Sequence, residues 1–176
     1  MLFSILNYGS SNLKSVQQSL INQNVTCKIT NNPQEILNSN CLIIPGVGSF
    51  SSAMKSIRQS NIENTISKFI KSGRLVVGIC LGMQLLFESS VEFGDTSGLA
   101  VLKGKVSSLE KINLKNNFKI PNIGWHKINY KKVLDDNFSE FDNQYMYFVH
   151  SFFVEPEEDI SLFVTKLGNN FFSSSI

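Results

Sequence analysis

The segment 75–87, with the sequence Leu-Val-Val-Gly-Ile-Cys-Leu-Gly-Met-Gln-Leu-Leu-Phe, constrains the fold more than any other part of the chain. Its first half follows Gly73 and is a short apolar run rich in β-branched residues, which is typical of a buried strand. Its second half contains good helix formers and predicts the start of a packed helix. Gly78 and Gly82 flank Cys80 two residues away on each side. The segment therefore predicts a strand that turns sharply into a helix at a cysteine.

This arrangement has a mechanical and a chemical meaning. A sharp strand-to-helix turn strains its central residue and needs small neighbours, as in the nucleophile elbow of hydrolases, which projects its side chain beyond the end of the sheet. The helix N-terminus that follows favours a thiolate, and the Leu81 N–H is expected to face an oxyanion on the attacked carbon. Cys80 is therefore a candidate nucleophile, and the alternative is a buried structural cysteine at a strand end.

Composition excludes several classes of protein. With 176 residues, 42% apolar and 17% charged, the chain fits one domain with a sizeable core and is not expected to be disordered. A net charge of +2 does not indicate binding to nucleic acid or to a membrane surface. The sequence shows neither a signal peptide nor an apolar run long enough to span a membrane. Cys27, Cys41 and Cys80 lack metal-like spacing, which favours a reducing cytoplasm and no metal site.

Upstream of the cysteine segment, apolar residues alternate between strand and helix patterns. The expected strands lie at about 2–6, 25–29 and 41–44, and the expected helices follow Asn12, begin at Pro33, and run through Ile62, Ile66, Phe69 and Ile70. This alternation predicts an α/β fold with a mostly parallel central sheet and helices on both faces. In such sheets ligands bind beyond the carboxyl ends of the strands.

Two glycine-containing loops follow the first and the third of these strands. The loop 45–50, Pro-Gly-Val-Gly-Ser-Phe, allows a peptide flip that aims an N–H at a ligand oxygen, and a plain strand-to-helix turn is equally compatible with it. The loop 7–12, Asn-Tyr-Gly-Ser-Ser-Asn, is compatible with a phosphate site, an ordinary turn or a contact with a partner. It has neither the lysine of a P-loop nor the glycine triplet of a dinucleotide site.

The second half of the chain changes character. Strand patterns recur at about 105–109, 123–130, 145–154, 162–166 and 171–176, without long helices between them. Pro121 and Gly124 are expected to keep the stretch around Trp125 irregular, and 155–159 is expected to be a solvated turn. These patterns predict a smaller antiparallel β region beside the parallel sheet, in a single domain.

Three motifs occur in order and together resemble the class I, or triad, glutamine amidotransferases. They are the segments 45–50, 78–87 and 147–152. The segments 7–9 and 121–125, with Asn12, narrow the resemblance to the glutaminase subunit of imidazole glycerol phosphate synthase. Because the resemblance covers nearly the whole chain, residues 1–176 are interpreted as one amidotransferase domain.

The resemblance implies a role for individual residues in glutamine hydrolysis. Cys80 is the implied nucleophile, which forms a glutamyl thioester, releases ammonia and is regenerated by water. The backbone N–H groups of Leu81 and, after a loop rearrangement, Val47 are the implied oxyanion hole. The implied glutamine-binding residues are Gly46, Gly48, Gln84, Glu92, Ser151 and Phe152.

The resemblance also implies a partner and no cofactor. In the family, ammonia passes to a (β/α)₈-barrel cyclase subunit that forms imidazole glycerol phosphate in histidine biosynthesis, in the cytoplasm. The glutaminase is weak until this partner binds its ligand, and a flip of the Val47 peptide is the implied switch. The implied partner-facing residues are Asn12, Pro121, Asn122, Gly124 and Trp125.

The chain departs from the family in one respect. The family supplies the base and its orienting carboxylate from a His-Pro-Glu sequence near the C-terminus, and these 176 residues contain no such sequence. The two histidines, His126 and His150, lie in other motifs, and neither is assigned as the base. We expect that the C-terminal end of the domain is missing, and the alternative is a natural chain without the base. In both cases we expect little glutaminase activity from these residues.

Two further functions remain open. A paralogous subunit would supply ammonia for the modification of surface sugars, and the segments 120–126 and 155–159 also fit that group. A catalytically inactive module would bind a partner without turning over glutamine. Fold does not decide between them, whereas neighbouring genes or rescue of a histidine auxotroph would separate the two amidotransferases.

Overall fold

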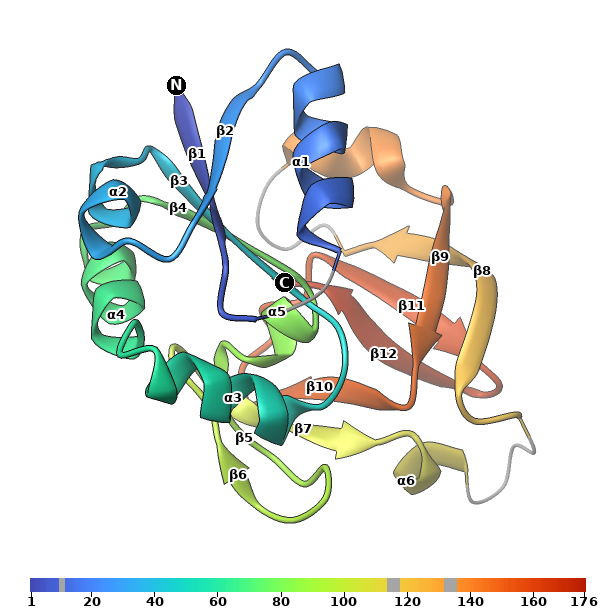
Figure 1. Cartoon of the computed structure of the whole chain (residues 1–176). Coiled ribbons are helices and arrows are strands. Elements are labelled where there is room, and N and C mark those ends of the chain that lie inside the picture. Colours follow the sequence, from blue (N-terminus) through green and yellow to red (C-terminus); the bar gives the residue numbers. More distant parts are fainter. Residues whose placement is uncertain (10–11, 114–117, 132–135) are drawn as a thin grey trace.

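The structure of the chain is a computed structural model that describes residues 1–9, 12–113, 118–131 and 136–176 (Figure 1). The part of the first glycine loop that contains Ser10 and Ser11 lies outside these residues. Within the described ranges no helix is long and apolar enough to cross a membrane.

A four-stranded parallel sheet organises the first half of the chain. Its strands are β1 (Leu2–Leu6), β2 (Thr26–Thr30), β3 (Cys41–Gly46) and β4 (Leu75–Cys80), in the order β2-β1-β3-β4. The strands predicted from the apolar runs are therefore confirmed. The register pairs Gly46 with Cys80, so the carboxyl ends of β3 and β4 lie side by side. This pairing brings the loop 45–50 next to the cysteine.

Helices cover both faces of this sheet (Figure 1). α1 (Leu13–Asn22) packs on one face, where it contacts a cluster of Ile5, Cys41 and Ile43. On the other face α2 (Pro33–Asn38), α3 (Phe50–Gln59) and α4 (Glu63–Lys71) bury large side chains such as Phe69 against the sheet. Each such burial stabilises the fold by roughly 1.5–3 kcal/mol. The predicted α/β architecture with a parallel sheet between helices is confirmed.

The prediction of a buried strand before Cys80 is wrong. β4 lies at the edge of the parallel sheet, and Leu75 is 59% and Ile79 40% exposed. The apolar run has the composition of a central strand, but its position in the strand order leaves one edge without a neighbour. Its outward side chains instead line a cleft described below.

The helix after Cys80 is shorter than predicted. α5 (Leu81–Gln84) is a single turn, and Phe87 already begins strand β5 (Phe87–Ser90). The carbonyl of Leu86 accepts hydrogen bonds from the N–H groups of Val101 and Leu102, and that of Phe87 from Ala100. These pairings with a distant segment replace the hydrogen bonds of a longer helix.

Two further four-stranded sheets form the second half, in the orders β10-β7-β5-β6 and β12-β11-β8-β9. Their pairs are antiparallel except for β5 with β7. The predicted antiparallel region is thus confirmed, although among the described residues it has more strands than the parallel sheet. Its remaining elements are β6 (Thr96–Ser97), β7 (Leu102–Ser108), α6 (Glu110–Asn113), β8 (Asn122–Tyr130), the 3₁₀ helix η1 (Asp136–Phe141), β9 (Tyr145–His150), β10 (Phe152–Pro156), β11 (Phe163–Leu167) and β12 (Asn170–Ser175).

The segment 145–154 is not one strand, as predicted, but two, β9 and β10, which belong to different sheets. Two predictions of irregular or turn structure in this half also need correction. The stretch around Trp125 is not irregular, because β8 begins at Asn122 and pairs with β9 along its first six residues. The solvated turn begins later than predicted, because Glu155 belongs to β10 and its carboxylate binds Ser107 and Lys111. In both places pairing with a distant strand overrides the local turn signal.

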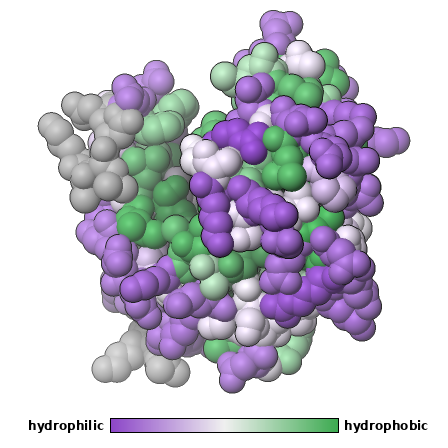
Figure 2. All heavy atoms as spheres, turned by 90° about the vertical axis from the view of Figure 1, so that its left-hand side faces the viewer, coloured by the Kyte–Doolittle hydropathy of each residue, from purple (hydrophilic) through white to green (hydrophobic). Residues whose placement is uncertain are grey.

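An apolar cleft of about 1060 Å³ lies where β4 and α5 face the β8–β9 and β11–β12 strands. In Figure 2, apolar side chains gather along a hollow between two lobes of the surface. Cys80 lies on the wall of this cleft, so the cleft borders the candidate active site.

Candidate active site

Cys80 lies at a sharp turn between β4 and α5. Its φ of +55° and ψ of −115° are angles that residues with a side chain rarely adopt. Such a conformation costs about 1–3 kcal/mol and is found mainly at functional sites. The side chain is exposed, so the alternative of a buried structural cysteine is wrong.

The two flanking glycines allow this turn because the backbone is packed too closely for a side chain. A Cβ on Gly82 would lie 1.7 Å from the carbonyl oxygen of Ile44 in β3. A Cβ on Gly78 would lie 2.7 Å from both the N and the Cα of Met83. Glycine is thus required at both ends of the Gly-x-Cys-x-Gly sequence, because α5 packs directly against the backbones of β3 and β4.

The loop 45–50 is anchored at both ends. At its start, the buried hydroxyl of Tyr8 donates a hydrogen bond of 2.7 Å to the carbonyl of Pro45. At its end, the carboxylate of Glu92 accepts a hydrogen bond of 2.6 Å from the N–H of Phe50. Rearrangement of this loop is therefore easiest in the peptides between these two anchors.

The middle of the loop lies against the first turn of α5. A Cβ on Gly46 would lie 2.9 Å from the Cβ of Leu81, so the two backbones are in close contact. Val47 and Gly48 are exposed, and Gly48 has a φ of +92° that favours glycine. As the first residue of α5, Leu81 has a backbone N–H without a partner inside the helix. The two residues implied to form an oxyanion hole therefore lie at the same edge of the sheet.

Gln84 connects α5 to strand β10. Its side-chain amide donates a hydrogen bond of 3.2 Å to the carbonyl of Phe152. The carbonyl of the preceding Ser151 accepts a hydrogen bond of 2.8 Å from the N–H of Leu109. The structure thus brings Gln84 and Phe152 together, while the Ser151 carbonyl is already used in pairing.

Both ring nitrogens of His150 lie within hydrogen-bond distance of neighbouring residues. Its Nδ1 lies 2.9 Å from the carbonyl of Phe152, and its Nε2 lies 2.9 Å from the side-chain amide nitrogen of Asn122. Burial lowers the pKa of His150 and keeps the ring neutral. With both nitrogens in hydrogen bonds, neither is free to take a proton from a thiol, in agreement with leaving His150 unassigned as base.

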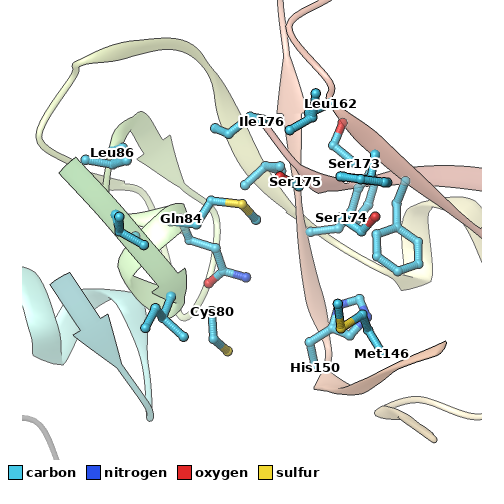
Figure 3. Close-up of a pocket in the computed structure, with 18 of the residues that line it drawn as sticks. Cys80, Gln84, Leu86, Met146, His150, Leu162, Ser173, Ser174, Ser175 and Ile176 are labelled. Atoms are coloured by element: carbon cyan, nitrogen blue, oxygen red, sulfur yellow. The ribbon is translucent and has the colours of Figure 1, made fainter. Parts of the chain in front are cut away.

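Figure 3 shows Cys80 and Gln84 on one side of the cleft and Met146 and His150 on the other. Most of the lining is apolar, and it comes from both halves of the chain. Cys80, Gln84 and Phe152 line this open cleft, whereas the loop residues Val47 and Gly48 do not.

The residues implied to face a partner divide into two groups. Pro121 and Trp125 are exposed, Trp125 to 66%, and Asn12 is exposed at the start of α1 with a φ of +68°. Gly124 is half-buried, and Asn122 is only 4% exposed with its amide on His150. The side chain of Asn122 therefore points into the molecule.

Comparisons with known proteins show the family of the chain. The family described as glutamine amidotransferase class-I matches residues 4–171. The chain is 38% identical over 167 residues to the imidazole glycerol phosphate synthase subunit HisH of Wolinella succinogenes, covering 90% of this chain and 78% of the relative. It is 40% identical over 168 residues to the protein of the same name in Caldanaerobacter subterraneus, covering 95% and 80%.

Solved structures support the fold independently of close sequence similarity. The crystal structure of a glutamine amidotransferase superposes with a TM-score of 0.70 at 16% identity, covering 97% of this chain and 88% of the other. A glutamine amidotransferase from Thermotoga maritima gives a TM-score of 0.61 at 16% identity, covering 97% and 73%.

Proposed function

The chain belongs to the class I glutamine amidotransferase family, and from that premise we propose that it is the glutaminase subunit of an imidazole glycerol phosphate synthase. The observation that carries the proposal is the exposed Cys80 in a strained turn between two tightly packed glycines. The proposal is also supported by relatives of that name at 38% and 40% identity over most of the chain.

The reaction is acyl transfer in two steps. The Cys80 thiolate attacks the side-chain amide carbon of glutamine and forms a C–S bond, and the carbonyl oxygen becomes an oxyanion. The Leu81 N–H donates to that oxyanion, and the Val47 N–H joins it after a peptide of the loop between Pro45 and Phe50 rotates. The C–N bond then breaks, and the nitrogen leaves as ammonia with the proton that the Cys80 thiol gave up. Water cleaves the thioester, its oxygen goes to glutamate and one of its protons restores the thiol.

Glutamine is held beside Cys80 by groups of the loop 45–50 and of later segments of the chain. Gln84 and Glu92 provide polar side chains, and Gly46, Gly48, Ser151 and Phe152 shape the pocket with their backbone. The proposal that these groups bind glutamine is supported by the contact of Gln84 with Phe152 and by the position of Glu92 at the end of the loop.

The ammonia is passed to a partner, a cyclase subunit of the (β/α)₈-barrel type. The candidate contacts with this partner are the exposed residues Trp125, Pro121 and Asn12. An exposed tryptophan with an edge-on tyrosine, Tyr147 at 5.6 Å, is the kind of aromatic anchor that is enriched at protein interfaces.

Turnover by these 176 residues alone is expected to be slow. The chain contains only two histidines, and both nitrogens of His150 are in hydrogen bonds. A cysteine nucleophile without a base forms and hydrolyses its thioester slowly, because general base catalysis typically contributes about 10²–10⁴-fold.

The test is to mix the chain with the cyclase subunit of an imidazole glycerol phosphate synthase and to measure complex formation and glutamate release. We expect a complex that Trp125→Ala weakens and that Cys80→Ala leaves intact, with slow glutamate release that Cys80→Ala abolishes. Absence of a complex would contradict the assigned partner. A complex without any Cys80-dependent reaction would instead identify an inactive binding module.

A further inference from the structure

A chain of hydrogen bonds runs from strand β8 to the turn after Cys80. The amide of Asn122 contacts His150, His150 contacts the carbonyl of Phe152, and the same carbonyl accepts the side-chain amide of Gln84. We propose that His150 is a positioning residue for the glutamine site, which fixes the Phe152 carbonyl and through it the side chain of Gln84. This inference rests on the proposed function for the identity of the substrate and of the partner that binds near Trp125.

The hydrogen-bond partners determine where the proton of His150 lies. A backbone carbonyl can only accept, so the contact of 2.9 Å with Phe152 requires a proton on Nδ1. A neutral ring then has a lone pair on Nε2, which accepts from the amide of Asn122 at 2.9 Å. The Nδ1–H tautomer satisfies both neighbours, and the opposite tautomer satisfies neither.

Packing holds the ring in this orientation. The ring centroid of His150 lies 4.9 Å from that of Phe172 and 5.8 Å from that of Phe148. The ring cannot rotate without displacing these side chains. The N–H that His150 donates to Phe152 is therefore fixed in direction.

The fixed orientation of His150 affects the active site through the Phe152 carbonyl. A carbonyl oxygen has two lone pairs, and here one is used by His150 and the other by Gln84 at 3.2 Å. If the His150 donor is lost, the Phe152 carbonyl loses one of its two hydrogen bonds to side chains, and the acceptor for the amide of Gln84 is less precisely oriented. Gln84 ends the single turn of α5 that begins directly after Cys80, so a displaced Gln84 changes the pocket beside the thiol.

The other end of the chain of hydrogen bonds, at Asn122, is buried but lies next to exposed residues. Asn122 is buried and is the first residue of β8, between exposed Pro121 and the exposed face that contains Trp125. A partner bound to that face that moves the start of β8 therefore acts on Gln84 through Asn122 and His150.

Two substitutions at His150 separate its two hydrogen bonds. His150→Asn places an amide N–H near the position of Nδ1 and keeps the donor to Phe152, whereas it loses the acceptor for Asn122. His150→Gln places an amide oxygen near the position of Nε2 and keeps that acceptor, whereas it loses the donor. Both variants remove the same ring from the same apolar contacts, so a role of His150 in ring packing alone predicts similar effects of the two substitutions.

The first readout is the side-chain amide resonance of Gln84 in the ¹H–¹⁵N spectrum of the protein without glutamine. We expect it to move in His150→Gln and to stay near its wild-type position in His150→Asn. Equal shifts in the two variants, or no shift in either, would overturn the inference. This readout does not depend on glutamine, so it decides the inference even if the proposed function fails.

The second readout is glutamine affinity, measured by calorimetry. We expect His150→Gln to weaken binding about tenfold, as for the loss of one hydrogen bond in a positioned polar site, and His150→Asn to stay within about threefold of wild type. Wild-type protein that does not bind glutamine would contradict the proposed function. Wild-type binding with equal losses in both variants would contradict the positioning role of His150.

Discussion

The residue on which the account depends is Cys80, where an exposed thiol and a strained backbone coincide. The strain of about 1–3 kcal/mol is sustained because Gly78 and Gly82 let the strand end and α5 pack without side chains between them. The three cysteines of the chain differ strongly in their surroundings, which makes the thiols a direct test of this local structure.

Limited reaction with iodoacetamide is expected to modify Cys80 first and Cys41 last. Cys80 is exposed and Cys27 is half-buried, whereas Cys41 is buried and burial raises the pKa of its thiol. A raised pKa lowers the thiolate fraction, and the thiolate is the reactive form. Peptide mass spectrometry over a time course measures the order, and modification of Cys41 before Cys80 would contradict the structure around both residues.

Gly82→Ala is expected to destabilise the protein far more than a glycine substitution that meets no neighbour. The added Cβ would clash with the Ile44 carbonyl at 1.7 Å, so the loss should reach about 3 kcal/mol or more. Gly94→Ala is the matched control, because its site is open and only its φ of +105° opposes a side chain, which costs about 1–2 kcal/mol. Urea unfolding measures both, and equal losses would show that close packing is not the reason for Gly82.

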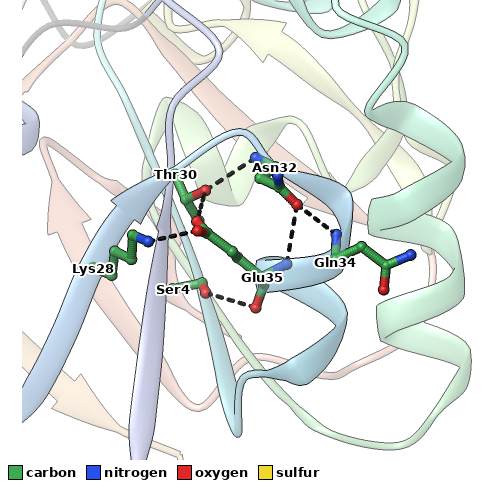
Figure 4. Close-up of polar contacts among 6 residues, drawn as sticks. All are labelled: Ser4, Lys28, Thr30, Asn32, Gln34 and Glu35. Atoms are coloured by element: carbon green, nitrogen blue, oxygen red, sulfur yellow. Dashed lines mark hydrogen bonds and ion pairs between the residues drawn. The ribbon is translucent and has the colours of Figure 1, made fainter.

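At the scale of elements, β2 and α2 are joined by a cluster of polar contacts around Glu35 (Figure 4). Its carboxylate accepts from Lys28 and from the hydroxyl of Thr30, and its backbone carbonyl accepts from Ser4. Asn32 caps α2 by accepting from the N–H groups of Gln34 and Glu35. The cluster fixes the geometry of the connection from β2 to α2.

This cluster predicts a pH dependence of stability. Hydrogen bonds from Lys28 and Thr30 lower the pKa of Glu35 below its ordinary value of 4.5. Because the folded-state pKa is depressed, the stabilisation is complete above the ordinary pKa and is lost as the pH falls through the folded-state pKa. Urea unfolding of wild type and Glu35→Gln should therefore show a gap at neutral pH that narrows in acid. A gap that widens in acid would contradict this sign.

The elements also show what the sequence could and could not predict. The elbow at Cys80 was predictable because its cause is local, namely two glycines at fixed spacing after a β-branched run. The edge position of β4 and the single turn of α5 were not, because they depend on strand order and on hydrogen bonds from Val101 and Leu102. A helical spacing of Phe50, Ala53, Met54 and Ile57 marks α3, but the prediction did not include it as a separate helix.

Among site residues, a motif located the loop 45–50, but no local signal revealed what anchors it. The hydrogen bond from Tyr8 to Pro45 and the path from Asn122 through His150 join residues that are far apart in the sequence. Such contacts follow from the packing of the two halves, so they could be found only in the structure.

The whole molecule is dominated by the apolar cleft between its parallel sheet and its second half. The cleft leaves the edge of β4 and side chains such as Val77 and Ile79 open to solvent. Exposed apolar surface next to an unpaired strand edge favours association between chains.

Val77→Lys is therefore expected to reduce self-association of the purified chain. Val77 is 37% exposed on β4 and lines the cleft, so a lysine there places a charge at the exposed strand edge. Ile21→Lys is the matched control, because Ile21 is 49% exposed on α1 and does not line the cleft. Sedimentation at several concentrations measures the effect, and an equal reduction by both substitutions would show that the cleft edge has no special role.

The central claim is that Cys80 is a nucleophile directed at glutamine, and the most direct test is labelling with a chloroketone analogue of glutamine followed by intact-mass and peptide-mass measurement. The account predicts one adduct, on Cys80, that excess glutamine suppresses and excess asparagine does not. Cys80→Ala should carry no adduct although Cys27 and Cys41 remain. Labelling that is spread over the three cysteines, or that glutamine fails to suppress, would contradict the claim.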